Sequence, residues 1–316
     1  MSKTIWITWE VHTRSRSISK ILNLKLIELI SNKNRFIKYI TLSYKTISAL
    51  KQHSPKVLII QNPSIVLSYL TLVLKPFFKY KLIMDCHNAA IFPCEGKFYL
   101  LNIIARFLIS KADFVIVTNT ELANIVKKLN GSPITLNDPI PVFQYEKKSK
   151  PTNHKFKITL ICTWAADEPV AEFLKAACKI ENAEFYVTGK VKNQNFPQKY
   201  SHVNFPGFLS RDEYIKLIAS SDLIVDLTTR ENCLVCGGYE GVGVEVPLLL
   251  SKTESLQATF DYGVVFCENT ESEITIGLQT AIESSEFYQE EIQKMKTIHM
   301  KRWEVASFEL IKEIIL

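Results

Sequence analysis

The segment DLIVDLTTRENCLVCGGYEGVGVEVPLLLS, residues 222–251, decides the fold. It opens with a short apolar run at 223–228, continues through a loop into a glycine-containing helical pattern at 239–245, and returns to an apolar run at 247–251. A strand, a helix and a second strand in this order form a unit whose two strands are parallel. The segment therefore predicts a parallel sheet covered by helices.

The same alternation of short apolar runs and helical patterns extends from one end of the chain to the other. In the first half we expect strands at 4–9, 36–40, 57–61, 82–86, 114–119 and 134–137, and helices at 17–30, 64–77, 96–111 and 121–129. In the second half we expect strands at 157–162, 184–188, 203–205, 223–228, 247–251 and 264–267. Two capping boxes, Ser210 with Glu213 and Thr270 with Glu273, mark the starts of two further helices.

A polar segment without periodicity, 143–155, separates the two halves and is typical of an interdomain linker. The fold class that follows is α/β, with two doubly wound, Rossmann-like domains at 1–145 and 156–300. Ligands bind at the carboxyl ends of the strands in such sheets, so we expect the two domains to face each other across a cleft.

Composition narrows the class of protein. The 316 residues, of which 47% are hydrophobic and 22% charged, exclude a disordered or collagen-like chain. No stretch reaches the roughly 18 apolar residues that span a bilayer. The start of the chain lacks the apolar core of a secretory signal, so a cytoplasmic location is expected. Seven scattered cysteines are typical of reduced thiols rather than of a disulfide framework.

Charge is unevenly distributed along the chain. Residues 1–150 hold 22 Lys and Arg against 8 Asp and Glu, whereas the remainder holds 16 against 24. A basic half suits nucleic acid, an anionic membrane surface or an anionic substrate, and a plain solvated surface is the alternative.

Four of the ten glycines lie between positions 237 and 243, in the turn that leads into the helix of the opening segment. Such a turn presents backbone N–H groups at the positive end of a helix dipole, which suits a phosphate or diphosphate. Tight packing of the helix on the sheet is the alternative. Glu240, in the first helical turn, is placed to accept hydrogen bonds from ribose hydroxyls.

The order strand, loop, Glu240, short glycine-containing helix, proline and strand resembles the carboxyl-terminal domain of nucleotide-sugar glycosyltransferases of the GT-B architecture, in particular glycosyltransferase family 4. The stretches DEYIKLIASSDLIVDLTTR, VTGK and FPGFLSRDEY in the second half, and DCHNA, VTNTELANIV and NDPIP in the first, resemble segments of the same enzymes. The resemblance covers nearly the whole chain. It implies that a helix at 301–316 packs back on the amino-terminal domain.

The resemblance implies a donor site formed mainly by the second half. Its expected nucleotide-sugar-binding residues are Arg14, Gly189, Lys190, Thr229, Arg230, Glu231, Gly237, Gly238, Tyr239 and Glu240. The first acid of the family's pair belongs at position 232, where this chain has Asn232 preceded by Glu231. A loop shift could bring Glu231 into place, or the first acidic role is absent.

A second departure lies in TWAADEP, where Asp167 and Glu168 replace the diphosphate-binding cations of the family and would repel a phosphate. Lys190, Arg230 and Lys252, at the ends of expected strands, are the candidate replacements, with solvated surface charges as the alternative.

The expected catalytic residues are Asp85, His87 and Glu240. Asp85 and His87 follow an apolar run, and a carboxylate next to an imidazole can orient or deprotonate a sugar hydroxyl. The resemblance implies that His87 contacts the donor sugar or supports transfer, and that Asp85 is the base if the reaction inverts configuration. A buried, hydrogen-bonded histidine is the alternative for His87. Asp138 is expected to line the same region or to be a turn residue before its proline.

Neither a metal ion nor a cofactor is expected. Cys233 and Cys236 form one C-x-x-C without the second pair that a structural zinc requires, and no Asp-x-Asp occurs. The helix dipole and cations would then stabilise the departing diphosphate. The segment YLTLVLKPFFKYK, residues 69–81, combines aromatic side chains with three lysines and suits a membrane interface, with a helix that covers the sheet as the alternative.

These features predict a cytoplasmic, membrane-associating glycosyltransferase that acts in bacterial surface polysaccharide synthesis. Its expected partners are a nucleoside diphosphate sugar, a glycan or lipid-linked glycan acceptor and an anionic membrane surface, without nucleic acid. A nucleotide-sugar 2-epimerase and a non-catalytic sugar-nucleotide-binding subunit are the alternatives.

Overall fold

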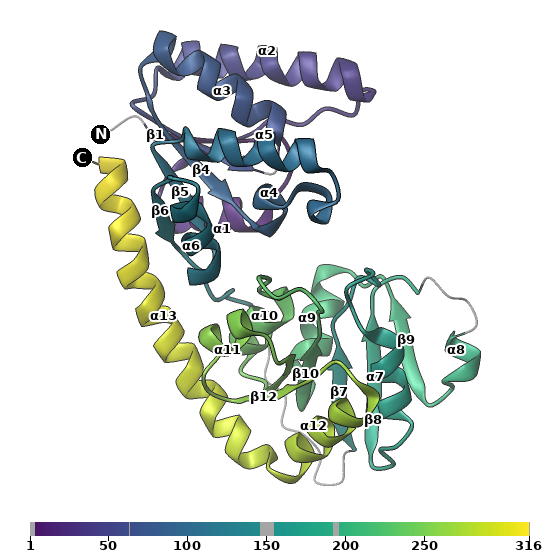
Figure 1. Ribbon diagram of the computed structural model, residues 1–316. Helices are drawn as coiled ribbons and strands as arrows, with labels where there is room; N and C mark the ends of the chain where they lie inside the picture. The colour runs from purple at the N-terminus through teal and green to yellow at the C-terminus, as the bar shows by residue number, and fades with distance from the viewer. Residues whose placement is uncertain (1–3, 63, 146–154, 192–195, 316) are drawn as a thin grey trace. The chain divides into compact units, whose positions relative to one another are not determined.

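A computed structural model of the protein describes residues 4–62, 64–145, 155–191 and 196–315 (Figure 1). The chain forms two compact units, one of Met1–Pro139 with Arg302–Leu316 and the other of Ile140–Lys301. Each unit contains a six-stranded parallel sheet flanked by helices, which confirms the α/β fold with two doubly wound domains. Within the expected linker, residues 146–154 lie outside the described part of the chain.

The sheet of the first unit has the order β2-β1-β3-β4-β5-β6. Its strands are β1 (Thr4–Thr8), β2 (Lys25–Glu28), β3 (Val57–Asn62), β4 (Lys81–Cys86), β5 (Phe114–Val117) and β6 (Pro133–Thr135). The helices between them are α1 (Thr13–Ile21), α2 (Arg35–His53), α3 (Ile65–Phe78), α4 (Asn88–Ile91), α5 (Tyr99–Ser110) and α6 (Thr120–Lys128), with a 3-10 turn η1 (Pro93–Gly96). The direction of winding reverses between β1 and β3, and this switch point is where doubly wound sheets bind ligands.

Helices cover both faces of this sheet. Leu42 of α2, Leu67 of α3 and Ile109 of α5 pack with one set of strand side chains. Ile18 of α1 packs with the opposite set, together with Trp303 from the last helix of the chain. That helix, α13 (Ser285–Ile315), begins in the second unit, and its residues from Arg302 onward belong to the first.

The sheet of the second unit has the order β12-β11-β10-β7-β8-β9, with its switch point between β10 and β7. Its strands are β7 (Phe156–Leu160), β8 (Ala183–Thr188), β9 (Val203–Gly207), β10 (Leu223–Asp226), β11 (Leu248–Ser251) and β12 (Val264–Cys267). Its other helices are α7 (Val170–Ala177), α8 (Phe196–Lys199), α9 (Arg211–Ala219), α10 (Cys236–Val244), α11 (Glu254–Thr259) and α12 (Glu271–Glu283). The capping box of Ser210 and Glu213 is present at the start of α9, and Thr270 caps α12.

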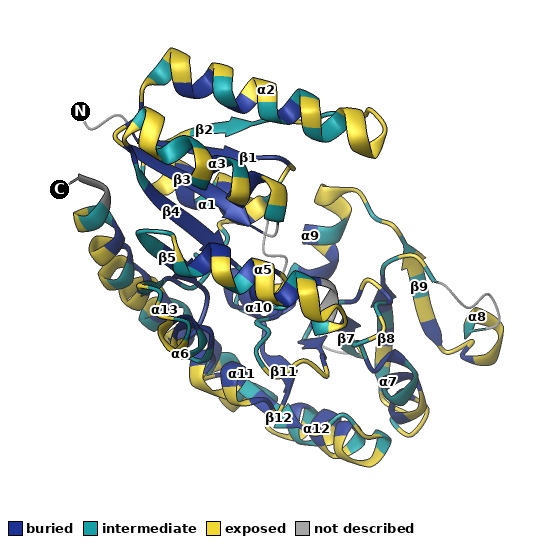
Figure 2. Ribbon diagram, turned by 45° about the horizontal axis from the view of Figure 1, so that its top comes forward, coloured by how far each residue is buried: buried dark blue, intermediate teal, exposed yellow. Residues whose placement is uncertain are grey.

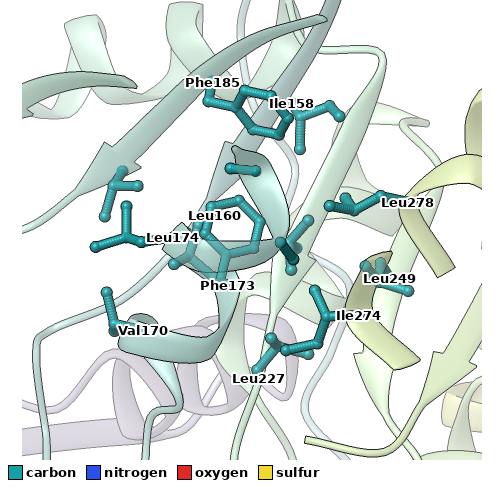
Figure 3. Packing of buried hydrophobic residues seen from close by; sticks show 14 of the residues in the cluster. Ile158, Leu160, Val170, Phe173, Leu174, Phe185, Leu227, Leu249, Ile274 and Leu278 are labelled. Atoms are coloured by element: carbon teal, nitrogen blue, oxygen red, sulfur yellow. The ribbon is translucent and has the colours of Figure 1, made fainter. Parts of the chain in front are cut away.

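The core of the second unit fixes the loops that carry its polar residues. Figure 3 shows Phe173 of α7 and Leu278 of α12 packed against Leu160, Phe185 and Leu249 of the strands. Each of these side chains is almost or completely excluded from solvent. Burial of a large apolar side chain stabilises the fold by about 1.5–3 kcal/mol, so the strand ends are held on a rigid base.

Two expected elements of the first half are wrong. The expected helix at 17–30 ends at Ile21 and is followed by strand β2, and the expected strand at 36–40 lies inside helix α2. Asn23, with a φ of 51°, adopts the left-handed conformation that terminates helices, and the side chain of Asn34 caps α2 by accepting from the N–H of Ile37. Among the helices of the described residues, none combines the length and the hydropathy of a segment that crosses a membrane.

Candidate functional site

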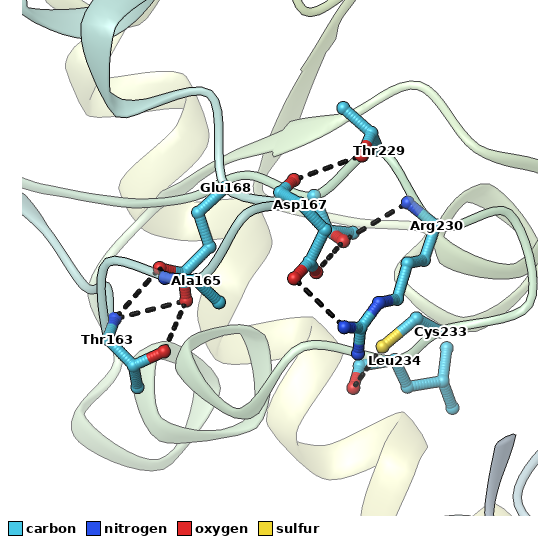
Figure 4. Close-up of polar contacts among 9 residues, drawn as sticks. Thr163, Ala165, Asp167, Glu168, Thr229, Arg230, Cys233 and Leu234 are labelled. Atoms are coloured by element: carbon cyan, nitrogen blue, oxygen red, sulfur yellow. Dashed lines mark hydrogen bonds and ion pairs between the residues drawn. The ribbon is translucent and has the colours of Figure 1, made fainter. Parts of the chain in front are cut away.

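The loop between β7 and α7 lies at the switch point of the second sheet, and its donor groups bind the carboxylate of Glu168, a residue of the same loop (Figure 4). Glu168 accepts hydrogen bonds from the backbone N–H groups of Thr163, at 3.0 Å, and Ala165, at 2.7 Å. It also accepts one from the Thr163 hydroxyl at 3.0 Å. Donors that converge in this way form a small anion-binding cradle, and in this chain Glu168 fills it.

Asp167 joins this loop to the loop after β10. Its Oδ1 pairs with Nη2 of Arg230 at 3.1 Å, and its Oδ2 accepts from the Thr228 hydroxyl at 2.9 Å. The N–H and the hydroxyl of Thr229 both donate to the Asp167 carbonyl oxygen, at 2.8 and 3.2 Å. Thr229 and Arg230 therefore lie together at the switch point, and Arg230 neutralises one of the two acids that would repel a phosphate.

The glycine turn at the start of α10 is capped by Asp226. The N–H of Gly237 donates to Oδ2 of Asp226 at 2.8 Å. Burial raises the pKa of Asp226 well above its usual value, and the charges of Glu240, Glu168 and Asp167 add to the rise, while the Gly237 bond opposes it. Four acids from three separate segments of the sequence thus share this edge of the sheet.

Protein atoms fill the space beside the glycines of the expected donor site. A methyl group on Gly237 would lie 2.5 Å from Oδ2 of Asp226, and one on Gly238 would lie 2.8 Å from the ring of Phe260. Gly189 has a φ of +80°, which residues with a side chain rarely adopt. The alternative of close packing therefore accounts for these three glycines, and the N–H of Gly237 already has a carboxyl group as its partner.

Tyr239 and Glu240, neighbours on α10, have different surroundings. Tyr239 is buried, with its ring 5.3 Å from that of His299. Glu240 is half-buried and accepts a short hydrogen bond from the Tyr214 hydroxyl of α9. Burial raises the pKa of Glu240, although the bond from Tyr214 opposes the rise. Of the two expected donor contacts, Glu240 is the one that keeps access to solvent.

Three further charged residues are exposed near the ends of strands. Lys190 follows β8, Glu231 lies in the loop after β10, and Lys252 follows β11, with its Nζ 3.8 Å from a carboxylate oxygen of Glu268. Because the carboxyl ends of parallel strands share one edge of a sheet, Lys190, Lys252 and Arg230 place three cations along the edge that carries the four acids.

The guanidinium of Arg14 is the centre of a buried network in the first unit. Arg14 lies on α1, just beyond β1, and is 4% exposed. It bonds Asp85 through Nε at 3.1 Å, Asp138 through Nη1 at 2.5 Å and the Leu136 carbonyl oxygen through Nη2 at 2.7 Å. Burial lowers the pKa of Arg14, but the two carboxylates outweigh it and the net shift is upward. Arg14, an expected nucleotide-sugar contact, therefore has three hydrogen-bond partners within the first unit.

His87 lies against the same network. Its Nε2 is 3.8 Å from Oδ2 of Asp85, and its ring is 4.9 Å from that of His12. Burial lowers the pKa of His87 more than the Asp85 charge raises it, so the imidazole is neutral near pH 7. Among the described residues, Nε2 of His87, Oδ2 of Asp85, Nδ1 of His12 and Oδ1 of Asn88 are buried without a hydrogen-bond partner. Such atoms mark a place suited to a polar ligand.

A pocket of about 200 Å³ opens at the switch point of the first sheet. It is lined by Trp9, Glu10, Lys38, Tyr39, Gln61 and Ser64. The rings of Trp9 and Tyr39 lie 6.1 Å apart, and Nε2 of Gln61 donates to Oε1 of Glu10 at 2.9 Å. Sequence reasoning missed Trp9 and Gln61, although both lie at the carboxyl ends of the strands that flank the switch point, which is the signal that identifies them.

The thiol of Cys233, in the C-x-x-C motif, lies in surroundings that disfavour the thiolate. Burial raises the pKa of Cys233 to about 11, which keeps this thiol protonated. In the ranges that the structure describes, no group of three or more His, Cys, Asp or Glu side chains is arranged to hold a metal ion.

Several solved structures are similar to this chain over nearly its whole length. Sucrose-phosphate synthase from Thermosynechococcus elongatus matches with a TM-score of 0.77 at 11% identity, over 98% of this chain and 97% of that chain. Anabaena Alr3699/HepE, in complex with UDP and glucose, matches with a TM-score of 0.74 at 11% identity, over 98% and 99%. A putative UDP-N-acetylglucosamine 2-epimerase from Listeria monocytogenes matches with a TM-score of 0.61 at 9% identity, over 93% and 91%.

No protein-family model matches the sequence, and no curated protein matches it. The structural matches establish the GT-B type of fold over nearly the whole chain.

Proposed function

We propose that the protein is a glycosyltransferase that moves a sugar from a nucleoside diphosphate sugar to a glycan acceptor without a metal ion. The observation that carries the proposal is a polar switch point in each unit of a fold whose solved examples include a complex with UDP and glucose. The donor is assigned to the second unit and the acceptor to the first. The acceptor is proposed to be lipid-linked, in bacterial surface polysaccharide synthesis at the cytoplasmic face of the membrane, and nucleic acid is not a partner.

At the proposed donor site Glu240 accepts hydrogen bonds from the ribose hydroxyls. Arg230 and Lys190 neutralise the diphosphate, and Arg230 exchanges its contact with Asp167 for a phosphate oxygen. Thr229 and Glu231, on the same loop, line the site. Cations and dipoles held in place before the reaction stabilise the charge that develops on the leaving diphosphate.

At the proposed acceptor site the pocket beside Trp9 and Tyr39 suits a sugar ring, because aromatic faces and a few polar groups together bind carbohydrate surfaces. In the reaction an acceptor hydroxyl attacks the anomeric carbon, the bond to the diphosphate breaks, and the hydroxyl proton passes to a base. Neutral His87 is assigned this role. Asp85, fully buried and paired with Arg14, orients the imidazole rather than reaching the acceptor itself.

The proposal is tested by incubating the protein with radiolabelled nucleotide sugars and membrane lipid. Label in the lipid fraction supports transfer. Glu240→Gln keeps an acceptor for the Tyr214 hydroxyl, so the variant should fold normally and lose at least about tenfold in kcat/KM, as expected when a charged hydrogen bond is removed. Glu283→Gln, at an exposed position near the end of α12, is the matched control. Near-normal turnover by Glu240→Gln would contradict the donor assignment.

A non-catalytic sugar-nucleotide-binding subunit is the second candidate. It is favoured by one observation, that Glu168 occupies the backbone donors of the β7–α7 loop where a donor phosphate is expected. In the same assay this candidate leaves the donor bound and unchanged, whereas a 2-epimerase would consume the donor without any acceptor and yield an epimerised nucleotide sugar.

A further inference from the structure

Three neighbouring helices of the first unit, α2, α3 and α5, carry apolar side chains on their outer as well as their inner sides. Their inner sides pack on the sheet. Six large side chains on the outer sides are 59–77% exposed: Phe36 and Tyr44 of α2, Tyr69 and Phe77 of α3, and Leu100 and Phe107 of α5. A helix with large apolar side chains on both its inner and its outer side is typical of an element covered on both sides. Here one covering partner is the sheet.

The outer sides form one continuous surface. Helix α3 contacts both α2 and α5, and all three lie on the same face of the sheet. Figure 2 shows exposed positions along each of the three helices. We call this surface, defined by the six side chains above, the α2–α3–α5 face. Contiguous exposed apolar surface of this kind marks an interaction site rather than scattered surface residues.

The charge of the α2–α3–α5 face is entirely positive. Helices α2, α3 and α5 contain no Asp or Glu, but they contain six Lys and Arg. Exposed Lys45 lies on α2, and exposed Lys79 and Lys111 end α3 and α5. The Nζ of Lys111 lies 5.4 Å from the centroid of the Phe107 ring. Aromatic and aliphatic side chains bordered by cations are the composition of a surface that lies in the headgroup region of an anionic bilayer.

Only part of residues 69–81, the segment expected from the sequence to contact a membrane, is exposed in the structure. Nζ of Lys75 pairs with Asp113 at 2.7 Å, and Nζ of Lys81 donates to the Glu313 carbonyl oxygen at 3.0 Å. Tyr80 is buried. These three residues are therefore used within the unit, and the exposed membrane candidates of the segment are Tyr69, Phe77 and Lys79.

We infer that the α2–α3–α5 face is a docking surface for an anionic lipid bilayer. Its apolar side chains enter the interface between headgroups and acyl chains, and its cations contact the anionic headgroups. A second copy of the chain is the less favourable occupant, because face-to-face pairing would bring the same cations against each other. The inference rests on the membrane location in the proposed function and names the surface responsible. It is tested separately from sugar transfer, since binding to lipid requires neither donor nor acceptor.

The experiment is flotation of the full-length protein with vesicles of neutral phosphatidylcholine alone or with about one third anionic phosphatidylglycerol. The parent protein should float with the anionic vesicles, and added salt should reduce binding because the cationic contribution is screened. Phe77→Ser with Phe107→Ser should lower the partition coefficient at least about tenfold, since both side chains leave water on binding. Lys79→Gln with Lys111→Gln should lower it severalfold on anionic vesicles only.

Matched controls lie in the second unit. Phe208 is 92% exposed and Lys216 is exposed, so Phe208→Ser and Lys216→Gln should bind as the parent does. Circular dichroism verifies that the exposed substitutions leave the fold intact. The inference is overturned if the parent protein does not float, or if Phe77→Ser with Phe107→Ser binds like the parent. It is also overturned if the parent is a dimer that ignores vesicles and that this double variant converts to a monomer.

Discussion

Replacement of Arg14 by alanine tests whether this residue holds the first unit together or serves a ligand. Its guanidinium bonds Asp85 at 3.1 Å and Asp138 at 2.5 Å, and Asp85 has no exposure to solvent. Arg14→Ala leaves that buried carboxylate without its counter-charge, which costs about 3–5 kcal/mol. In a unit of this size the loss lowers the melting temperature by about 6–20 °C.

Arg16 provides the matched control on the same helix. Its Nε and Nη2 each lie 2.8 Å from a Glu28 oxygen, but the pair is exposed, so Arg16→Ala should leave the melting temperature nearly unchanged. Arg14→Lys keeps the charge without the fork geometry and should fall between the parent and Arg14→Ala. Thermal unfolding followed by circular dichroism, with nucleotide titration in parallel, is the measurement. A normal melting temperature combined with weaker nucleotide binding in Arg14→Ala would refute the structural role and restore Arg14 to the donor site.

Three further predictions concern titratable groups. Asp226→Asn keeps an acceptor for the N–H of Gly237 and removes a carboxyl group whose pKa rises on folding. In denaturant unfolding the variant should therefore be more stable than the parent protein, by an amount that grows as the pH rises from 3.8. An equal difference at all pH values would contradict this. Glu168→Gln should strengthen binding of nucleoside diphosphates by about tenfold in calorimetry, because a charge near the phosphates is removed; unchanged affinity would place the diphosphate elsewhere. In the pH profile of the transfer rate, the fall in rate at acidic pH should lie below pH 6.5, because burial lowers the pKa of His87. This fall should be absent from the residual activity of His87→Asn. If it persists in that variant, another group is responsible for it.

The alternation of apolar runs predicted the two parallel sheets because strands buried on both faces require short, nearly continuous apolar runs, which stand out in a sequence. The errors lie at an edge strand and the helix beside it. β2 is half-exposed, so it lacks the continuous apolar run of a central strand. The first turn of α2 contains Phe36 and Ile37, which also suit a strand. Two asparagines mark the true boundaries: Asn23 ends the first helix in the left-handed conformation, and Asn34 is the N-cap of α2.

The candidate site was predictable by position but not by partner. Strand ends located Asp85, His87 and Arg230, since doubly wound sheets collect polar residues there. The sequence could not show that Arg14 pairs with Asp138, 124 positions away, because such a contact depends on how the strands are ordered. The capping of Gly237 by Asp226, 11 positions earlier, depends on how the loop between β10 and α10 folds, and it has no local signature in the sequence.

At the switch point of the second sheet, the protein's own carboxyl groups bind the donors that would otherwise suit an anionic ligand. This explains how the edge is stable without a bound anion. Unpaired backbone N–H groups are costly to bury, and Glu168 and Asp226 supply the acceptors for Thr163, Ala165 and Gly237. The consequence is four acids close together, and the raised pKa of Asp226 reflects that crowding as well as its burial. A diphosphate that enters this edge must either displace Glu168 or lie outside it against the exposed cations. If the diphosphate displaces Glu168, its affinity depends on the charge of Glu168. If it lies in the outer position, its affinity depends on the charges of Arg230 and Lys190. The relative effect of charge removal at these residues therefore locates the phosphates without a ligand-bound structure.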